Sequence, residues 1–323
     1  MAKAGQKALG ILREAGCETF FPPHPAPFNA DDLLNLLPGT DAVLAGVEPY
    51  SAGVLSAPGV TKLRIISRWG VGCDAIDVLA ATEQGIVIAN TPGLLDEAVA
   101  DYTFALLLAL ARQVHVGHLG MHEGLWKPAW GCDVAGKTLG LVGCGRIGLA
   151  VARRATGFNL RLLATDPRVS PEATALGIRY LSLEQVLAES DFVSLHAALT
   201  PENRNLIGEP QLRKMKPTAL LINAARGALV DEAALARALR ENWIAGAALD
   251  VFCNEPLLAN HPLRGTRNLL LTPHQASFAH PTGERVSLAA AQAILDLMAG
   301  RQPQFVVNPN VFKSKACRSL IRD

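Results

Sequence analysis

Residues 138–148 read TLGLVGCGRIG, and this stretch decides the fold of the chain. Thr138–Val142 is an apolar run that is long enough for a buried strand and too short for a helix. Three glycines follow at G-x-G-x-x-G spacing, and Leu149–Phe158 then carries apolar residues at helical intervals. The stretch therefore predicts a strand, a tight turn and the N-terminus of a helix, which is the order that a dinucleotide-binding loop requires.

Each glycine has its own physical task in such a loop. Gly143 permits the turn, Gly145 lets the backbone approach a pyrophosphate, and Gly148 lets the helix pack closely on the strand. The unpaired N–H groups and the positive dipole end of the helix would then face the phosphates. Glycines in an ordinary turn are the alternative reading, and the order of the elements around them argues against it.

A second strand, predicted over Leu160–Thr165, ends in Asp166. This acid follows the last glycine at close to the spacing expected for a carboxylate that binds the adenosine ribose. Asp166 would repel a 2′-phosphate, so the sequence predicts NAD as the cofactor. Arg168 follows closely and keeps NADP open as the lesser alternative.

The composition bounds the class of protein. A length of 323 residues suggests two domains, and 50% hydrophobic with only 18% charged residues is typical of a compact enzyme. A net charge of +1 gives no reason to expect nucleic acid or an acidic membrane as partner. The six cysteines form no C-x-x-C pair, which predicts free thiols in a reducing, cytoplasmic setting.

The first part of the chain alternates between predicted helices and strands. Ala42–Val47, Leu63–Ser67 and Ile86–Ala89 read as strands, and Cys73–Ala81 between the last two reads as a helix. This alternation is the signature of a parallel sheet covered by helices. No apolar β run precedes the first predicted helix, Ala2–Gly16, although such domains usually open on a strand.

The middle of the chain forms one uninterrupted α/β unit between two long predicted helices, Leu95–Arg112 and Glu284–Met298. Six strands are predicted in it, near residues 139–143, 160–165, 192–197, 218–223, 247–251 and 268–272. The fold class is therefore α/β, with two Rossmann-like or flavodoxin-like domains built on doubly wound parallel sheets. Because the last helix should return to the first domain, we expect a discontinuous substrate-binding domain (1–94 and 281–323), an NAD-binding domain (95–280) and a cleft between them.

Three ionisable residues follow predicted strands of the second domain. Arg226 follows Leu220–Asn223, Glu255 follows Ala247–Val251, and His274 follows the last strand. Open α/β sheets bind ligands at such strand ends. An arginine can bind a substrate carboxylate bidentately, through two parallel hydrogen bonds. A histidine can exchange the hydroxyl proton while a neighbouring carboxylate holds the imidazole ring in place. Taken singly, Arg226 also fits a surface ion pair, Glu255 a helix N-terminal or turn acid, and His274 a loop cap. Taken together, the three residues predict a hydride-transfer site.

The sequence resembles the D-isomer-specific 2-hydroxyacid dehydrogenases, and among them the phosphoglycerate dehydrogenase branch. The stretches that carry the resemblance are SRWGVGCDAID (67–77), NTPG (90–93), AVADYTFALLLALAR (98–112), GKTLGLVGCGRIG (136–148), MKPTALLINAARGALVDEAAL (215–235), ALDVFCNEP (248–256) and TPH (272–274). The similarity runs from about Gly46 to about Asn310.

The resemblance implies roles for named residues. Arg226 would orient the substrate, Glu255 would support the imidazole and His274 would be the acid/base. The other implied contacts are the pyrophosphate with Arg146 and Ile147, the ribose with Asp166, the nicotinamide pocket with Asp250, Ala224 and Arg226, and the substrate carboxylate with the amides of Gly70, Val71 and Gly72. Two departures from the family pattern are the missing first strand and Ala198, which stands where a proline is common.

Other segments carry weaker expectations. Phe20–Phe28 holds four prolines and is expected to be irregular, and the basic tail Val311–Asp323 is expected to be a solvated end. Trp126 and Trp130 are expected to be packing aromatics. His115, His118 and His122 share one helical face, but no carboxylate supports a metal site, so none is predicted.

These features predict an NAD-dependent oxidoreductase that interconverts a D-2-hydroxy acid and its 2-oxo acid. The substrate expected first is a phosphoglycerate-like acid. The alternatives are a glyoxylate or hydroxypyruvate reductase and, from another class, a non-enzymatic NAD-sensing scaffold like a co-repressor. The catalytic set argues against the scaffold. The resemblance also implies a homodimer, with Leu95–Arg112 near its interface.

Overall fold

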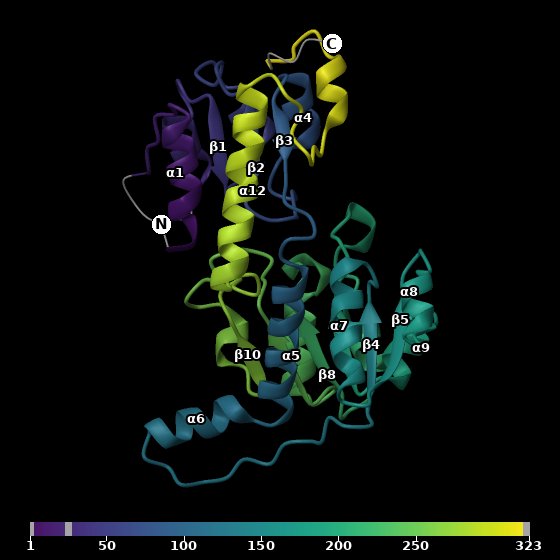
Figure 1. The fold of residues 1–323 in the computed structure, drawn as a ribbon. Helices are drawn as coiled ribbons and strands as arrows, with labels where there is room; N and C mark the ends of the chain where they lie inside the picture. The colour runs from purple at the N-terminus through teal and green to yellow at the C-terminus, as the bar shows by residue number, and fades with distance from the viewer. Residues whose placement is uncertain (1–2, 23–27, 319–323) are drawn as a thin grey trace. The chain divides into compact units, whose positions relative to one another are not determined.

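The computed structural model describes residues 3–22 and 28–318, and in it the chain divides into two compact units (Figure 1). One unit comprises Met1–Leu95 and Phe278–Asp323, and the other comprises Asp96–Ser277. Most of the proline-rich segment predicted to be irregular, residues 23–27, lies outside the described residues, as does the end of the basic tail. Both units contain parallel sheets and helices, so the α/β class predicted from the sequence is confirmed.

The unit of residues 96–277 is built on a seven-stranded parallel sheet in the order β10-β9-β8-β7-β4-β5-β6. β4 has β5 on one side and β7 on the other, so the strand order reverses there and the loop after β4 lies at a topological switch point. Six of the strands were predicted; β6 was missed because two residues are too short to show a period. The bounds are β4 Thr138–Val142, β5 Arg161–Thr165, β6 Arg179–Tyr180, β7 Phe192–Leu195, β8 Leu220–Asn223, β9 Gly246–Leu249 and β10 Leu269–Leu271.

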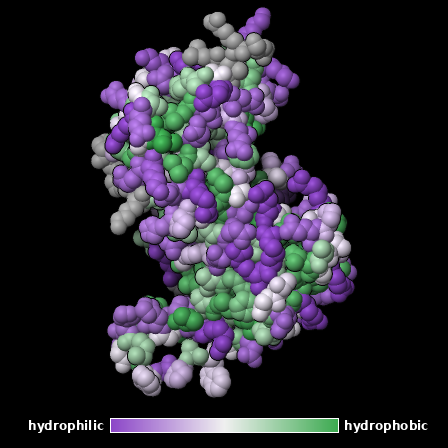
Figure 2. All heavy atoms as spheres, viewed as in Figure 1, coloured by the Kyte–Doolittle hydropathy of each residue, from purple (hydrophilic) through white to green (hydrophobic). Residues whose placement is uncertain are grey.

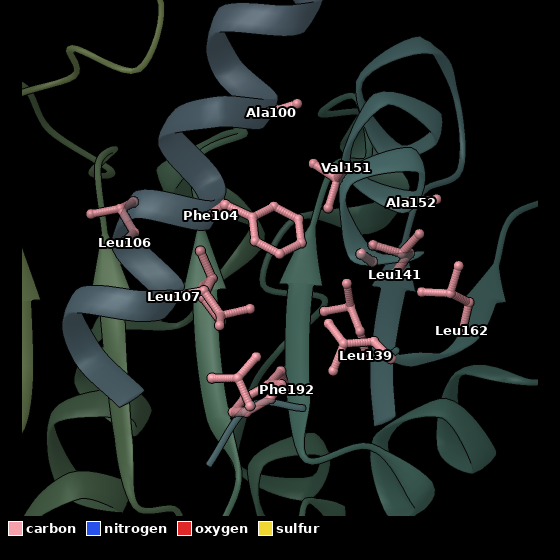
Figure 3. Packing of buried hydrophobic residues seen from close by; sticks show 14 of the residues in the cluster. Ala100, Phe104, Leu106, Leu107, Leu139, Leu141, Val151, Ala152, Leu162 and Phe192 are labelled. Atoms are coloured by element: carbon pink, nitrogen blue, oxygen red, sulfur yellow. The ribbon is translucent and has the colours of Figure 1, made fainter. Parts of the chain in front are cut away.

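Helices cover both faces of this sheet. α5 and α7 bury one face, where Phe104 stacks on Phe158 with ring centroids 5.3 Å apart. Figure 3 shows side chains of α5, such as Phe104 and Leu107, lying among those of α7 and the strands. α9, α10 and α11 bury the other face. The helix bounds are α5 Asp96–Ala111, α6 Val114–His122, α7 Arg146–Thr156, α8 Pro171–Ala175, α9 Leu183–Glu189, α10 Glu209–Lys214 and α11 Glu232–Arg240, with 3-10 turns η2 Pro201–Asn203, η3 Gly227–Leu229 and η4 Pro262–Gly265.

The packing of α5 on α7 is reinforced by ion pairs. Arg153 and Arg154 of α7 pair with Glu97 of α5 at 2.9 and 2.8 Å, and Arg154 also pairs with Asp101 at 2.6 Å. Glu97 lies in the first turn of α5, where negative charge also suits the helix dipole. The helix that follows the glycine loop is therefore held against a long, mostly apolar neighbour.

The other unit has a three-stranded parallel sheet in the order β1-β2-β3. Among the described residues no strand precedes α1, so β1 forms an edge of the sheet. α12 packs with α1 over the buried strands, and Ala89 of β3 also bridges Val306 in antiparallel fashion. The bounds are η1 Lys3–Gly5, α1 Gln6–Glu14, α2 Ala30–Leu36, β1 Ala42–Ala45, α3 Ala52–Leu55, β2 Ile65–Arg68, α4 Val78–Glu83, β3 Val87–Ala89, α12 His280–Met298 and η5 Pro309–Lys313.

Two local predictions in this unit are wrong. The helix expected over Cys73–Ala81 begins only at Val78, because the Asp77 side chain accepts the Ala80 N–H and caps the helix there. The tail expected to be solvated folds back as far as residue 318. Arg318 donates to the carbonyls of Val60 and Leu63, so this part of the tail is tied to the body of the unit.

α6 and the chain after it form an arm, residues 114–131, that extends away from the sheet of its unit (Figure 1). No residue of α6 is buried, and Trp126 and Trp130 are 86% and 97% exposed. The prediction that these tryptophans pack inside the chain is therefore wrong. Figure 2 shows apolar atoms, in green, on the surface of this arm at the bottom of the view.

Within the described chain no single helix is both long and apolar enough to cross a membrane, although α5 and α6 together pass that test across a bend of 67°.

Candidate active site

The glycine loop after β4 is shaped by close backbone contacts. Gly143 has a φ of +92°, and a Cβ there would lie 2.5 Å from the Ala197 nitrogen. A Cβ on Gly148 would lie 2.5 Å from the Gly143 oxygen. A Cβ on Gly145, in contrast, would meet no atom within 4 Å. Two of the glycines are thus required by the fold, while the third opens onto free space.

The N-terminus of α7 faces that space without a protein cap. Gly145 is the N-cap and offers no side chain to the first turn. No acceptor among the described residues takes the N–H groups of Arg146, Ile147 and Gly148. Unpaired amides at the positive end of a helix are the donors that bind a pyrophosphate. These residues therefore fit the phosphates of a dinucleotide.

Asp166 ties the end of β5 to the glycine loop. One carboxylate oxygen accepts the Cys144 N–H and the other accepts the Arg168 N–H, each at 2.8 Å. A carboxylate has lone pairs left after two such bonds, so Asp166 retains the capacity to accept from a ribose hydroxyl. Arg146, predicted to meet the pyrophosphate, has its guanidinium 2.7 Å from the nearly buried carboxylate of Asp96.

Arg226, Glu255 and His274 follow β8, β9 and β10, which are neighbours in the sheet. The Nδ1 atom of His274 lies 2.6 Å from Oε2 of Glu255. Oε1 of Glu255 accepts the Phe252 N–H at 2.9 Å. The imidazole is therefore held by a carboxylate that is itself held by the backbone.

The electrostatics of Glu255 match this arrangement. Burial alone would raise the pKa of its carboxyl, but the hydrogen bond and charge of His274, the Phe252 N–H and the charge of Arg226 together lower that pKa below the ordinary value. Glu255 is thus ionised beside the imidazole at neutral pH. The positive charge of the Arg226 guanidinium contributes to this lowered pKa, so the guanidinium acts on the Glu255 carboxylate.

Two buried polar residues hold the backbone of the site, and sequence reasoning did not assign them that task. Asn223 donates from its amide to the Arg226 carbonyl at 2.8 Å and accepts the Ala225 N–H. Asp250, predicted near the nicotinamide, is fully buried, and burial raises the pKa of its carboxyl. Its carboxylate accepts bonds from the Thr272 hydroxyl and from the N–H groups of Gln275 and Ala276.

This loop gives His274 an unusual backbone. Its φ is +50°, a left-handed conformation that costs energy for a residue other than glycine. Its N–H donates to the Asp250 carbonyl at 2.7 Å. Asp250 thus bonds to residues before and after His274, and these hydrogen bonds offset the cost of the left-handed backbone that directs the imidazole toward Glu255.

Gly227 allows the Arg226 turn to meet the loop that carries Glu255. A Cβ at this position would overlap the carbonyl group of Phe252. Only glycine lets the two backbones approach this closely, which is why the A-A-R-G sequence after β8 ends in glycine.

The predicted carboxylate-binding loop lies after β2 in the other unit. The Gly70 N–H is already taken by the Thr91 hydroxyl at 3.0 Å. No acceptor among the described residues takes the Val71 and Gly72 N–H groups. Arg68 shapes the loop by donating to the carbonyls of Trp69 and Gly72. Two of the three predicted amides are therefore available to a carboxylate.

Other histidines do not join the catalytic set. Burial lowers the pKa of His196 to about 4, so this imidazole beside the glycine loop is neutral and bonds the Ser194 hydroxyl at 2.9 Å. On the arm, the His118 and His122 rings lie edge to face, and His115 contacts the Ala109 carbonyl. No group of three or more possible metal ligands occurs among the described residues.

Comparison with known proteins agrees with this geometry. A family model described as D-isomer specific 2-hydroxyacid dehydrogenase, NAD binding domain, matches residues 104–276. A glyoxylate reductase of Korarchaeum cryptofilum is 46% identical over 296 residues, which are 89% of each chain. A solved Thermus thermophilus structure has a TM-score of 0.83 and 42% identity over 94% of this chain and 97% of its own. A solved glyoxylate reductase from Paecilomyes thermophila has a TM-score of 0.82 and 31% identity over 94% of each chain.

The fold and site thus define a nicotinamide-dependent dehydrogenase, and the chain belongs to the D-isomer-specific 2-hydroxyacid dehydrogenase family. It is an NAD-dependent oxidoreductase acting on the CH–OH group of donors. The sequence predicted both the family and the cofactor, and the non-enzymatic scaffold is set aside.

The lowered pKa of Glu255 predicts a pH-dependent contribution to stability. Because the folded pKa lies below the ordinary value of 4.5, the contribution is full above about pH 4.5 and is lost as the pH falls further. Urea unfolding from pH 3.5 to 7 should show wild type and Glu255→Gln converging in free energy of unfolding only below about pH 4.5. A difference that stays constant over this range would contradict the assignment.

Proposed function

We propose that the protein is a glyoxylate reductase that also accepts hydroxypyruvate, with NADH as the reductant. The observation that carries the proposal is the Glu255–His274 pair, with the Arg226 charge acting on Glu255, in the same unit as an uncapped dinucleotide loop. Relatives that are 41–46% identical are named glyoxylate reductases, which supports this substrate over the phosphoglycerate-like one expected first.

The charges of the first unit also favour an unphosphorylated substrate. A phosphate would need extra cations, and the basic residues nearest in sequence to the loop after β2 are Lys62, Arg64 and Arg68. Arg64 instead lies 3.7 Å from Asp41, and Arg68 is engaged by carbonyls of its own loop. Lys62 is exposed. A small 2-oxo acid needs only one carboxylate site, which the Arg226 guanidinium can supply.

The chain's own residues then divide the chemistry among them. The amides of the glycine loop and Asp166 would hold NADH, which would supply a hydride to the carbonyl carbon of the 2-oxo acid. Arg226 polarises the carbonyl oxygen and binds the carboxylate. His274 donates a proton to the oxygen as the alcohol forms, and Glu255 stabilises the charged imidazole before that transfer. The reverse direction returns the same proton to His274.

A panel of 2-oxo acids tests the substrate. With NADH, glyoxylate and hydroxypyruvate should give the highest kcat/KM, and 3-phosphohydroxypyruvate should be at least about tenfold worse because Arg64 and Arg68 are already engaged and cannot receive its phosphate. NADPH should be the poorer reductant because Asp166 repels a 2′-phosphate. A preference for the phosphorylated acid would overturn the proposal.

His274→Ala tests the proton donor. Loss of a general acid lowers rates by about 10²–10⁴-fold, so kcat for glyoxylate reduction should fall within that range. NADH binding, followed by fluorescence, should stay within about twofold, because the glycine loop and Asp166 are untouched. Turnover at the wild-type rate would remove His274 as the acid/base.

The exposed arm supports a homodimer. A nine-residue helix with no buried residue is only marginally stable in water by itself, so α6 needs another surface to pack against. Its sequence, VHVGHLGMH, has no acidic residue, lysine or arginine, and two copies can therefore meet without burying like charges. Exposed Leu119, Trp126 and Trp130 add apolar surface of the kind found at protein interfaces.

Analytical ultracentrifugation tests this interface. The double variant Trp126→Ser, Trp130→Ser should sediment as a monomer at concentrations where wild type is dimeric, since buried tryptophans carry much interface energy. Leu258→Ser, which changes an exposed leucine outside the arm, is the matched control and should stay dimeric. A monomeric wild type, or a double variant that remains dimeric, would exclude the arm as the interface.

A further inference from the structure

Glu232 lies outside the set Arg226, Glu255 and His274 but is bonded to the same loop. Oε1 of Glu232 accepts the Cys253 N–H at 2.8 Å, and Cys253 lies between Phe252 and Glu255. Its Oε2 lies 3.3 Å from Nε2 of His261. The side chain is only 11% exposed, compared with 47% for Glu241 at the other end of α11.

The second contact does not require a charged histidine. Nδ1 of His261 accepts the Leu263 N–H, so in the neutral ring the hydrogen is on Nε2 and points at Glu232. Both oxygens of a nearly buried carboxylate are therefore satisfied by groups that come from the segment after β9. One bond reaches the loop of Glu255, and the other reaches the start of η4.

The loop after β9 has few other anchors. Residues 252–256 form no helix or strand. The Phe252 N–H donates to Glu255 itself, and the Cys253 thiol contacts the Val230 carbonyl at 3.9 Å and also interacts with the Glu232 carboxylate. Burial and the nearby Glu232 charge raise the pKa of this thiol to about 11, so it stays protonated. The Cys253 N–H bond is thus a main restraint on the peptide that precedes Glu255.

We infer that Glu232 is a positioning residue for the proposed reaction, which holds the Cys253 peptide so that Glu255 meets His274 at hydrogen-bond distance. This inference rests on the proposed function, because it assigns Glu255 and His274 the proton transfer. The simpler reading is that Glu232 only adds negative charge to the first turn of α11. Asp231 already caps that helix with two hydrogen bonds, so the simpler reading does not require a buried carboxylate.

Glu232→Asp separates the two readings. The shorter side chain keeps the charge at the start of α11 but withdraws its oxygens from the Cys253 N–H. We expect kcat to fall about tenfold, as for other small misplacements of catalytic groups, with the Kd for NADH and the thermal midpoint close to wild type. Glu232→Ala should lower kcat at least as much. The control Glu241→Ala, which removes an exposed carboxylate of the same helix, should keep wild-type kcat.

A double-mutant cycle shows whether Glu232 acts through Glu255. In a Glu255→Ala background, which removes the acceptor of the His274 hydrogen bond, Glu232→Asp should change kcat by less than about twofold, because the contact it supports is already lost. An equal fall in kcat in both backgrounds, or no fall in the wild-type background, would overturn the inference. The cycle can be run with whichever 2-oxo acid the enzyme reduces best, so a wrong substrate in the proposed function is seen separately.

A measurement without turnover keeps the inference testable if no substrate of the panel is reduced. A proton in the short His274–Glu255 hydrogen bond should give a downfield NMR signal. Glu232→Asp should shift this signal upfield or broaden it, and Glu241→Ala should leave it in place. An unchanged signal in Glu232→Asp would contradict the positioning role.

Discussion

Parallel strand order is the constraint on which the rest of this site depends. In the unit of residues 96–277 every strand pairs in parallel, so the carboxyl ends of β4, β8, β9 and β10 lie along one edge. The loops that leave this edge carry the glycine loop, Arg226, Glu255 and His274. The glycine loop and the residues proposed for catalysis therefore lie at the same edge because of the sheet, although the first glycine and the histidine are far apart in the chain.

Buried polar groups turn this edge into a rigid site. Asn223, Asp250 and Glu232 each form hydrogen bonds with the backbone of a loop that carries Arg226, His274 or Glu255, the side chains proposed for catalysis. Burying such groups is costly unless every polar atom is bonded, and here the bonds go to backbone that no helix or strand satisfies. The strained backbone of His274 is held by the same means. Stability and positioning thus come from one network.

Much of the fold and site could be predicted from the sequence because the signals are local. The strand–glycine–helix order of residues 138–158, the acid after the next strand and the runs of apolar residues are all short-range patterns. One wrong prediction, the helix start after Cys73, missed the local cap at Asp77. The other wrong predictions involve residues whose environment is not local: the tail reaches Val60 through Arg318, and Trp126 lies exposed on the arm.

The sequence by itself determined the parallel α/β architecture, the cofactor loop with Asp166, and the candidates Arg226, Glu255 and His274. Only the tertiary structure decided that Thr91 occupies the Gly70 amide, that Arg64 and Arg68 are already engaged, and that Glu232 binds the loop of Glu255. The physical reason is the range of the interactions. Periodicity and turn chemistry act between near neighbours, whereas these hydrogen bonds and ion pairs join residues that only folding brings together.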